Sequence, residues 1–286
     1  MALASTESRC KINLFLRVTG RRADDYHTLE TVFLPLAAPS DTLEADFDAA
    51  PGVALETDAP ELAGEDNLVC RAAARYAAAA GLTPRWRFRL EKRVPVAAGL
   101  GGGSADAAAA LRLLEERFGA LGGEKLKSLA LELGADVPFF LDPHPAVARG
   151  VGEELTPVAA KELPLLLVDP GFPVSAKWAY RRFDICGAEP SAGTLEGVLS
   201  GLADGDREQV AHNVRNDLAP ALWRKFPVLS LIRDELRARG ALAVEVSGSG
   251  PALFAVMPDR SSARETAAEL NERFPRWRCF AAEVLQ

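Results

Sequence analysis

Apolar and polar residues alternate along positions 11–18, and this period of two predicts a β-strand. One face of that strand is polar and carries Lys11 and Asn13. The opposite, apolar face is formed by Ile12, Leu14, Leu16 and Val18. Similar patterns predict further strands over 26–33, 42–47, 86–90, 165–168 and 279–285, and two strands within 242–257 that a turn at 247–251 joins.

A helical period governs the segments between these strands. Helices are predicted over 67–80, 105–118, 124–133, 175–183, 194–202, 227–239 and 262–274. Strands and helices follow one another without a regular βαβ period, which favours an α+β fold. The periodic pattern of apolar and polar residues becomes irregular near residues 156–162. We therefore expect two domains, 1–160 and 161–286.

A glycine-rich stretch, 95–108, stands directly before the predicted helix 105–118. Ser104 is the expected N-cap of that helix. A glycine-rich loop that leads into a helix N-terminus gathers unpaired N–H groups and the positive end of the helix dipole, which suits a phosphate. The stretch is neither a Walker A motif nor a Rossmann fingerprint, because the required Gly-Lys-Ser/Thr and third glycine are missing. The alternative is a flexible loop before an ordinary helix.

Composition and charge narrow the class of protein. The chain has 286 residues and a net charge of -7, which argues against a general binder of nucleic acid or membrane surfaces. We expect no transmembrane helix and no secretory signal, since no apolar run approaches the required length. The four cysteines are far apart and form no CxxC pair, so zinc and thioredoxin chemistry are not expected. A reduced, cytoplasmic protein is the simplest expectation.

Three stretches together resemble the GHMP kinase superfamily: Lys11-Ile12-Asn13, the glycine-rich stretch 95–108 and the turn 246–251. Within the superfamily, the closer resemblance is to the kinases that act on a cytidine-diphosphate-linked methylerythritol. It rests on Arg21-Arg22, Asp25-Tyr26-His27, Leu133 to Phe140 and Asn216-Asp217-Leu218. The pair Tyr26-His27 distinguishes this group from the other GHMP kinases. Cys10 departs from the expected alanine, which affects local packing only.

The resemblance implies an activity and a fold. The activity is transfer of the γ-phosphoryl of ATP, with Mg²⁺, to the 2-hydroxyl of the cytidine-linked substrate, a step of mevalonate-independent isoprenoid synthesis. The fold is an N-terminal α+β domain with the phosphate loop, a ferredoxin-like C-terminal α+β domain, and an active site in the cleft between them. The expected partner is this small molecule, with neither nucleic acid nor membrane.

The resemblance also implies catalytic roles for two residues. Asp136 corresponds to the catalytic base and Lys11 to the lysine that keeps the base ionised and polarises the substrate hydroxyl. Asn13 is expected to orient Lys11 and to line the substrate site. Without the resemblance, Lys11 is an ordinary solvated strand residue and Asp136 an ordinary turn residue or helix cap.

Further residues fall where the family contacts its two ligands. Asn67 and Lys92 correspond to contacts with the adenine end of ATP, although Asn67 is equally a helix N-cap. The phosphate loop is formed by Pro95, Val96, Ala97, Ala98, Gly99, Leu100, Gly101, Gly102, Gly103, Ser104 and Ala105. Ser104 is also a candidate ligand of the metal.

The expected cytidine site contains Tyr26 and His27 at the base and an aromatic ring stacked on it. Tyr180 is the expected ring and Trp178 its competitor; a half-buried histidine and core packing are the ordinary roles of His27 and Tyr180. The substrate diphosphate is expected at Ser247, Gly248, Ser249 and Gly250. Two alternative functions remain: another small-molecule GHMP kinase, such as a homoserine or mevalonate kinase, and a non-catalytic nucleotide-binding protein. The oligomeric state is left open.

Overall fold

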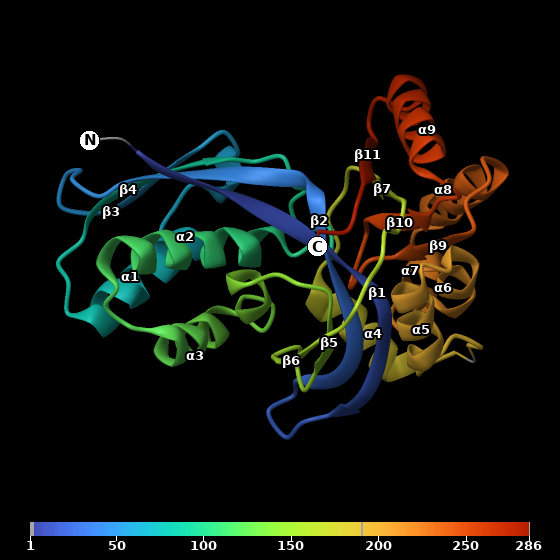
Figure 1. Ribbon diagram of the computed structural model, residues 1–286, viewed down its shortest axis with the longest axis horizontal. Coiled ribbons are helices and arrows are strands. Elements are labelled where there is room, and N and C mark those ends of the chain that lie inside the picture. The colour runs from blue at the N-terminus through green and yellow to red at the C-terminus, as the bar shows by residue number, and fades with distance from the viewer. Residues whose placement is uncertain (1–2, 190, 286) are drawn as a thin grey trace. The chain divides into compact units, whose positions relative to one another are not determined.

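The computed structural model describes residues 3–189 and 191–285, which form two compact units of mixed helices and strands (Figure 1). The first unit contains residues up to 10, 39–94 and 101–143, and the second contains 11–38, 95–100 and the chain from 144 onward. The chain passes between the units several times because the strands β1 (Ala4–Arg21) and β2 (His27–Asp46) each contribute residues to both. The α+β prediction is confirmed.

In the first unit, helices pack on a small sheet. The strand β3 (Gly52–Thr57) runs parallel to β4 (Arg85–Glu91), and β4 is antiparallel to the part of β2 from Thr42 to Asp46. The helices are α1 (Leu68–Ala80), α2 (Gly102–Phe118) and α3 (Gly123–Leu133), with 3₁₀ turns at Pro60–Leu62 and Pro138–Leu141. Alanines 107 to 110 of α2 are fully buried, so α1 can approach α2 closely.

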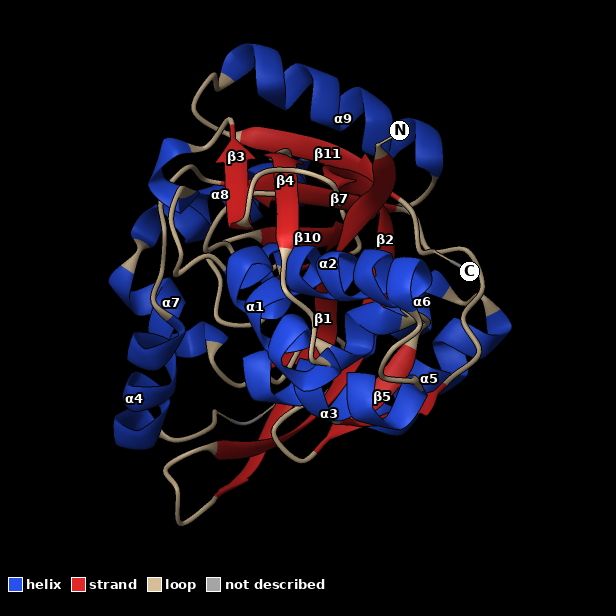
Figure 2. Ribbon diagram, turned by 90° about the vertical axis from the view of Figure 1, so that its left-hand side faces the viewer, coloured by secondary structure: helices blue, strands red, loops and turns tan. Residues whose placement is uncertain are grey.

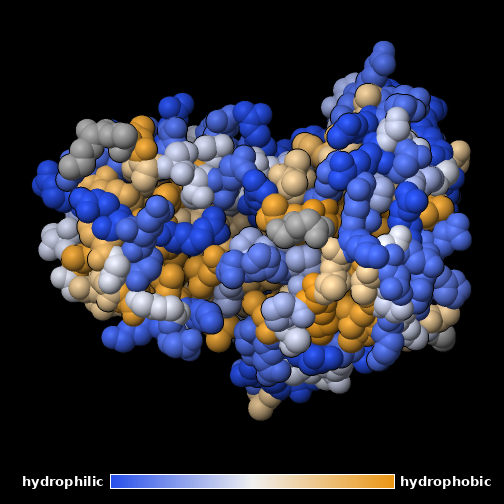
Figure 3. Space-filling model, in the orientation of Figure 1, coloured by the Kyte–Doolittle hydropathy of each residue, from blue (hydrophilic) through white to orange (hydrophobic). Residues whose placement is uncertain are grey.

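The second unit contains a four-stranded antiparallel sheet in the order β11-β7-β10-β9. Its strands are β7 (Leu165–Asp169), β9 (Ala243–Val246), β10 (Leu253–Val256) and β11 (Arg278–Ala282). With α8 (Pro227–Ala238) before β9 and α9 (Arg260–Arg273) before β11, this order is that of a ferredoxin-like fold. Figure 2 shows α9 lying across β11, and its outward face is hydrophilic in Figure 3.

Further strands and helices of the second unit lie outside this four-stranded sheet. The strand β5 (Ala146–Arg149) pairs with the first half of β2 and with β6 (Glu154–Pro157), and β8 (Arg215–Asn216) runs parallel to β1 at Phe15 and Leu16. The helices are α4 (Ala176–Cys186), α5 (Leu195–Asp204), α6 (Arg207–Asn213) and α7 (Ala219–Lys225).

The sequence predictions are confirmed for most elements and corrected for some. The segment 42–47 is not a separate strand but the end of β2. The first strand does not have one polar face, because residues 10–16 are buried on both faces. The elements β3, β5, β6, β8, α6 and α7 were not predicted. All six have seven or fewer residues, which is too short for a clear hydrophobic period.

Two further findings concern the expected class of protein. Across residues 3–189 and 191–285, no helix is long and apolar enough to span a bilayer. Cys10, Cys70 and Cys279 are buried, and Cys186 is exposed. The proposed domain boundary at residue 160 remains a prediction.

Candidate functional site

A buried polar network in the second unit holds Lys11 and Asn13 on the same side of β1, as the alternation predicts. The Lys11 Nζ donates to the Asn13 Oδ1 at 2.6 Å, and the ammonium lies 4.8 Å from the centre of the Phe33 ring. The Asn13 Nδ2 in turn donates to the Thr31 Oγ1 at 2.9 Å. Lys11 and Asn13 are only 4% and 3% exposed, so the alternative interpretation of Lys11 as a solvated strand residue is wrong. The network gives the lysine a fixed direction.

The turn 247–250 packs against residues 97–100 of the glycine-rich loop, both within the second unit. The Ser247 Oγ donates to the carbonyl oxygen of Gly99 at 3.0 Å and accepts the Asn13 N–H at 3.3 Å. Gly99 has a φ of +82°, and a Cβ added there would lie 2.2 Å from the Ser247 carbonyl oxygen. Only glycine fits this approach. The turn between β9 and β10 therefore lies against Asn13 of β1 as well as against the glycine-rich loop.

A second cluster in this unit surrounds His27 at the start of β2. The ring of His27 stacks on Tyr180 of α4, with centroids 4.9 Å apart and planes at 24°. The His27 Nε2 lies 2.6 Å from the Asp184 Oδ1, and Arg21 forms an ion pair with the other carboxylate oxygen at 3.4 Å. The structure thus brings Tyr180 and His27 together, as expected for parts of one binding site.

The two other aromatic candidates behave differently. Trp178 packs edge-on against Phe226, 5.7 Å between ring centroids, and both Trp178 and Tyr180 pack against the periphery of the hydrophobic core. Tyr26 is 63% exposed and follows Asp25, which has a φ of 69°. Tyr180 and Trp178 therefore differ in their ring partners and not in their packing against the core: Tyr180 stacks on His27, which is itself a candidate for the cytidine site.

In the first unit, α2 begins within the run of glycines, which the sequence did not predict. The helix begins at Gly102, its N-cap is Gly101 with φ 74° and ψ 12°, and Ser104 lies inside the first turn. Ser104 is therefore not the N-cap. Gly101 takes that position because its left-handed backbone is accessible to glycine, and no side chain caps the helix. The first N–H groups of α2 have no partner within the helix and suit an anion.

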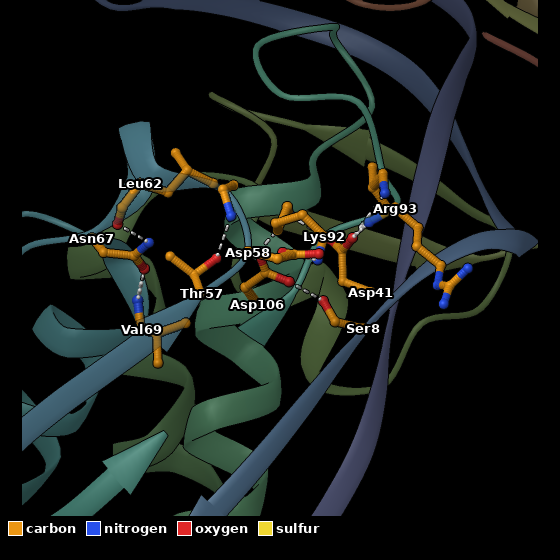
Figure 4. Close-up of polar contacts among 12 residues, drawn as sticks. Ser8, Asp41, Thr57, Asp58, Leu62, Asn67, Val69, Lys92, Arg93 and Asp106 are labelled. Carbon is orange, nitrogen blue, oxygen red and sulfur yellow. Dashed lines mark hydrogen bonds and ion pairs between the residues drawn. The ribbon is translucent and has the colours of Figure 1, made fainter. Parts of the chain in front are cut away.

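Asn67 caps the neighbouring helix α1, as the ordinary interpretation of this residue predicts. Its Oδ1 accepts the Val69 N–H at 2.8 Å, and its Nδ2 donates to the Leu62 carbonyl oxygen at 3.0 Å (Figure 4). Capping uses one oxygen, which does not exclude a ligand contact.

Lys92 lies between two carboxylates, also in the first unit. Its Nζ donates to Asp106 at 2.7 Å and to Asp41, and Asp106 accepts a further hydrogen bond from Ser8 at 2.7 Å (Figure 4). The lysine side chain is 7% exposed. Burial acts to lower the pKa of Lys92, but the charges of Asp106 and Asp41 outweigh it and raise the pKa.

Asp136 lies in the turn between α3 and the 3₁₀ turn at Pro138, also in the first unit. The Val137 N–H donates to the Gly134 carbonyl oxygen at 3.1 Å, which closes this turn. Val137 is buried and helical, with φ -63° and ψ -40°. Asp136 is partly buried, a position from which a carboxylate can reach both solvent and a ligand.

Sequence reasoning missed the partners that hold the predicted residues. Thr31, Asp41, Asp106 and Asp184 were not singled out, although each contacts a residue that was. Asn216 carried part of the resemblance without a role. Its Nδ2 donates to the carbonyl oxygens of Val246 and Gly248 at 2.8 and 2.7 Å, which fixes the turn 247–250.

Comparison with known proteins identifies the family. The model of the GHMP kinases N terminal domain matches residues 67–142, and the model of the GHMP kinases C terminal region matches residues 198–276. The chain is 40% identical to the 4-diphosphocytidyl-2-C-methyl-D-erythritol kinase of Solidesulfovibrio magneticus, covering 93% of each chain. It is also 40% identical to that of Pelotomaculum thermopropionicum, covering 91% of each.

Solved structures agree with these relatives. A crystal structure of 4-(cytidine 5'-diphospho)-2C-methyl-D-erythritol kinase matches with a TM-score of 0.84 and 36% identity, over 99% of this chain and 100% of that one. A homoserine kinase from Cytophaga hutchinsonii matches with a TM-score of 0.74 at 18% identity, over 98% and 95% of the two chains, which supports the fold alone. The chain belongs to the 4-diphosphocytidyl-2-C-methyl-D-erythritol kinase family of GHMP kinases.

Proposed function

We propose that this chain transfers the γ-phosphoryl of ATP to the 2-hydroxyl of 4-diphosphocytidyl-2-C-methyl-D-erythritol, in mevalonate-independent isoprenoid synthesis. The observation that carries the proposal is the glycine-capped N-terminus of α2 in a chain of this family. Phosphoryl transfer depends mainly on neutralising charge and on placing the reactants, so the proposal assigns a group to each task.

The phosphates of ATP bind the first turn of α2. Its N–H groups point out of the helix, and the positive end of the helix dipole favours the anion. Mg²⁺ usually binds through one or two protein oxygens together with phosphates. Among the described residues, no three acidic, histidine or cysteine side chains are placed so that they could hold a metal ion by themselves. The Ser104 hydroxyl is its proposed protein ligand. When bound, Mg²⁺ offsets charge on the phosphates.

Lys11 and Asp136 divide the chemistry at the substrate hydroxyl and the transferring group. Asp136 accepts the proton of the 2-hydroxyl, and Lys11 stabilises the negative charge that develops. The contact between Lys11 and Asn13 supports this role, because an ammonium of fixed direction stabilises charge without reorganising during the reaction.

The cytidine end anchors the substrate. Tyr180 stacks on the base, while Tyr26 and His27 contact its polar edge. The turn 247–250 offers backbone N–H groups to the diphosphate. Base recognition of this kind supplies binding energy far from the reacting hydroxyl, which the enzyme uses to place that hydroxyl.

Replacing Tyr180 by alanine is expected to raise the KM for the cytidine substrate by about 5- to 150-fold, which corresponds to about 1–3 kcal/mol of lost stacking. The KM for ATP changes little, and Tyr180→Phe is mild because the ring remains. Steady-state kinetics with each substrate varied in turn measures both constants. Trp178→Ala is the matched control; a larger effect of Trp178→Ala on the substrate KM would transfer the stacking role to that ring.

Two substitutions separate the capping role of Asn67 from its proposed contact with adenine. Asn67→Asp keeps an oxygen for the Val69 N–H, so α1 stays capped, but it loses the amide, which donates one hydrogen to the Leu62 carbonyl oxygen and has a second for adenine. We expect the Kd for ATP, measured by calorimetry, to rise by about 2- to 10-fold, the value of one hydrogen bond. Asn67→Ser is the comparison, because serine also caps. Unchanged ATP affinity in both folded variants would leave Asn67 a cap alone.

An ADP-release assay tests the function itself. The enzyme is expected to release ADP with 4-diphosphocytidyl-2-C-methyl-D-erythritol and not with homoserine or mevalonate. Free methylerythritol, which lacks the nucleotide, is expected to be a very poor substrate. Efficient turnover of mevalonate or homoserine instead would overturn the assignment, and binding of ATP without turnover of any of them would indicate a non-catalytic protein.

A further inference from the structure

A buried ion-pair cluster lies beneath the first turn of α2. Lys92, which follows β4, contacts Asp41 of β2 and Asp106 of α2, and Ser8 of β1 donates to Asp106 (Figure 4). Asp41 also accepts the N–H groups of Arg93 and Val94 at 2.5 and 2.8 Å. Four separate segments of the chain therefore meet at one ammonium and two carboxylates. Buried clusters of this kind are costly unless every charge is paired, which is the case here.

The cluster is close to the backbone on which the phosphate site is proposed. A Cβ added at Gly102 would lie 3.4 Å from the Lys92 Nζ and 3.0 Å from the Val94 Cγ1. Asp106 is four residues after Gly102, hence on the same face of the helix and one turn further on. Gly102 and Asp106 thus face Lys92 on the inner side of the first two turns, while Gly103 is exposed on the outer side.

The two carboxylates of the cluster also make it possible for a positively charged residue, Lys92, to lie near the N-terminus of α2. A cation at a helix N-terminus is unfavourable for the helix, whereas an anionic ligand there is favourable. The carboxylates of Asp41 and Asp106 offset the repulsion between Lys92 and the positive end of the helix dipole. The Lys92 ammonium is therefore buried next to the proposed phosphate site. Burial raises the pKa of Asp106 to about 6, although the charge of Lys92 acts in the opposite direction. Asp106 is thus ionised and paired with Lys92 above that pH.

We propose that Asp106, acting through Lys92, is a positioning residue for ATP: it sets the direction of the N–H groups in the first turn of α2. The proposal rests on the proposed phosphate site, but not on the identity of the phosphoryl acceptor. Groups that bind a ligand in a fixed geometry need support from a second layer of contacts, and a misplacement of about 1 Å can lower activity about 100-fold.

The test is calorimetric titration of the full-length protein with ATP at about pH 8, where Asp106 is ionised. Asp106→Ala removes one carboxylate but leaves Lys92 paired with Asp41, so no charge is orphaned. We expect its Kd for ATP to rise at least about 10-fold. Asp106→Asn keeps the shape and a neutral amide oxygen that accepts a hydrogen bond from the Lys92 ammonium, and an intermediate rise of about 2- to 5-fold is expected.

A matched control separates positioning from a general loss of stability. Tyr76→Phe removes the hydrogen bond from the Tyr76 Oη to Glu115, 2.6 Å long, near the other end of α2. It is expected to lower the thermal unfolding temperature while ATP affinity stays at the wild-type value. Hydrogen exchange provides a second readout: Asp106→Ala is expected to speed exchange in residues 101–106 and to leave residues 111–118 protected.

Each outcome decides the proposal. A graded loss of ATP affinity from Asp106→Asn to Asp106→Ala, with Tyr76→Phe unaffected, supports it. Wild-type ATP affinity in Asp106→Ala, or an equal loss in Tyr76→Phe, overturns it. Should Asp106→Ala not fold, Asp106→Asn decides alone, with wild-type affinity as the contrary result. An enzyme that binds ATP but does not phosphorylate the cytidine substrate would refute the proposed function and leave this inference intact.

Discussion

Asp136→Asn is expected to lower kcat by about two orders of magnitude or more, the range for loss of a general base. The amide keeps the shape of the carboxylate and cannot accept the proton. The Kd for ATP is expected to remain near the wild-type value, because the first turn of α2 is unchanged. Single-turnover kinetics, in which enzyme is in excess over substrate, measures the chemical step directly.

Glu132→Gln is the matched control for this variant. Glu132 lies four residues earlier, at the end of α3, and forms an exposed ion pair with Arg75 at 3.3 Å. Exposed pairs contribute little to stability, so this loss of a carboxylate is expected to change neither folding nor kcat. Near-normal turnover in Asp136→Asn would remove Asp136 from the role of base.

The sequence was sufficient for features that depend on near neighbours. The glycine-rich loop before a helix, the Asn67 cap and the turn at 247–250 each follow from a few consecutive residues, and the structure has all three. The α+β class follows from the order of strands and helices. These are short-range properties, which local propensity and periodicity report well.

Features that depend on contacts between residues far apart in the chain could not be predicted from the sequence. The Asp41–Lys92 pair spans 51 positions and the His27–Asp184 contact 157, and no local pattern marks them. Lys11 and Asn13 were placed on the polar face of the first strand, and their burial was not predicted, because the alternation does not show that both faces of β1 are covered. Ser104 was assigned as the N-cap because serine is the better capping residue in general, whereas the left-handed backbone at Gly101 places the helix start three residues earlier than predicted.

Gly102→Val is expected to raise the Kd for ATP by about 100-fold or more while the protein remains folded. The first side-chain carbon would lie 3.0 Å from the Val94 Cγ1, and the two γ-methyl groups of valine need still more room. The first turn of α2 must then move away from β4 and the Lys92 cluster, and its N–H groups leave the geometry that the phosphates require. Calorimetric titration with ATP measures the loss, and circular dichroism and thermal unfolding verify the fold.

Gly123→Val is the control that matches this change most closely. Gly123 is the first residue of α3, as Gly102 is of α2, and a Cβ there meets nothing within 4 Å. The same substitution at the same helix position is therefore expected to leave ATP affinity unchanged. Combining Gly102→Val with Val94→Ala removes the closest contact and is expected to restore part of the affinity, because the turn can return toward its original place. A folded Gly102→Val protein with wild-type affinity would show that ATP phosphates do not bind at the first turn of α2.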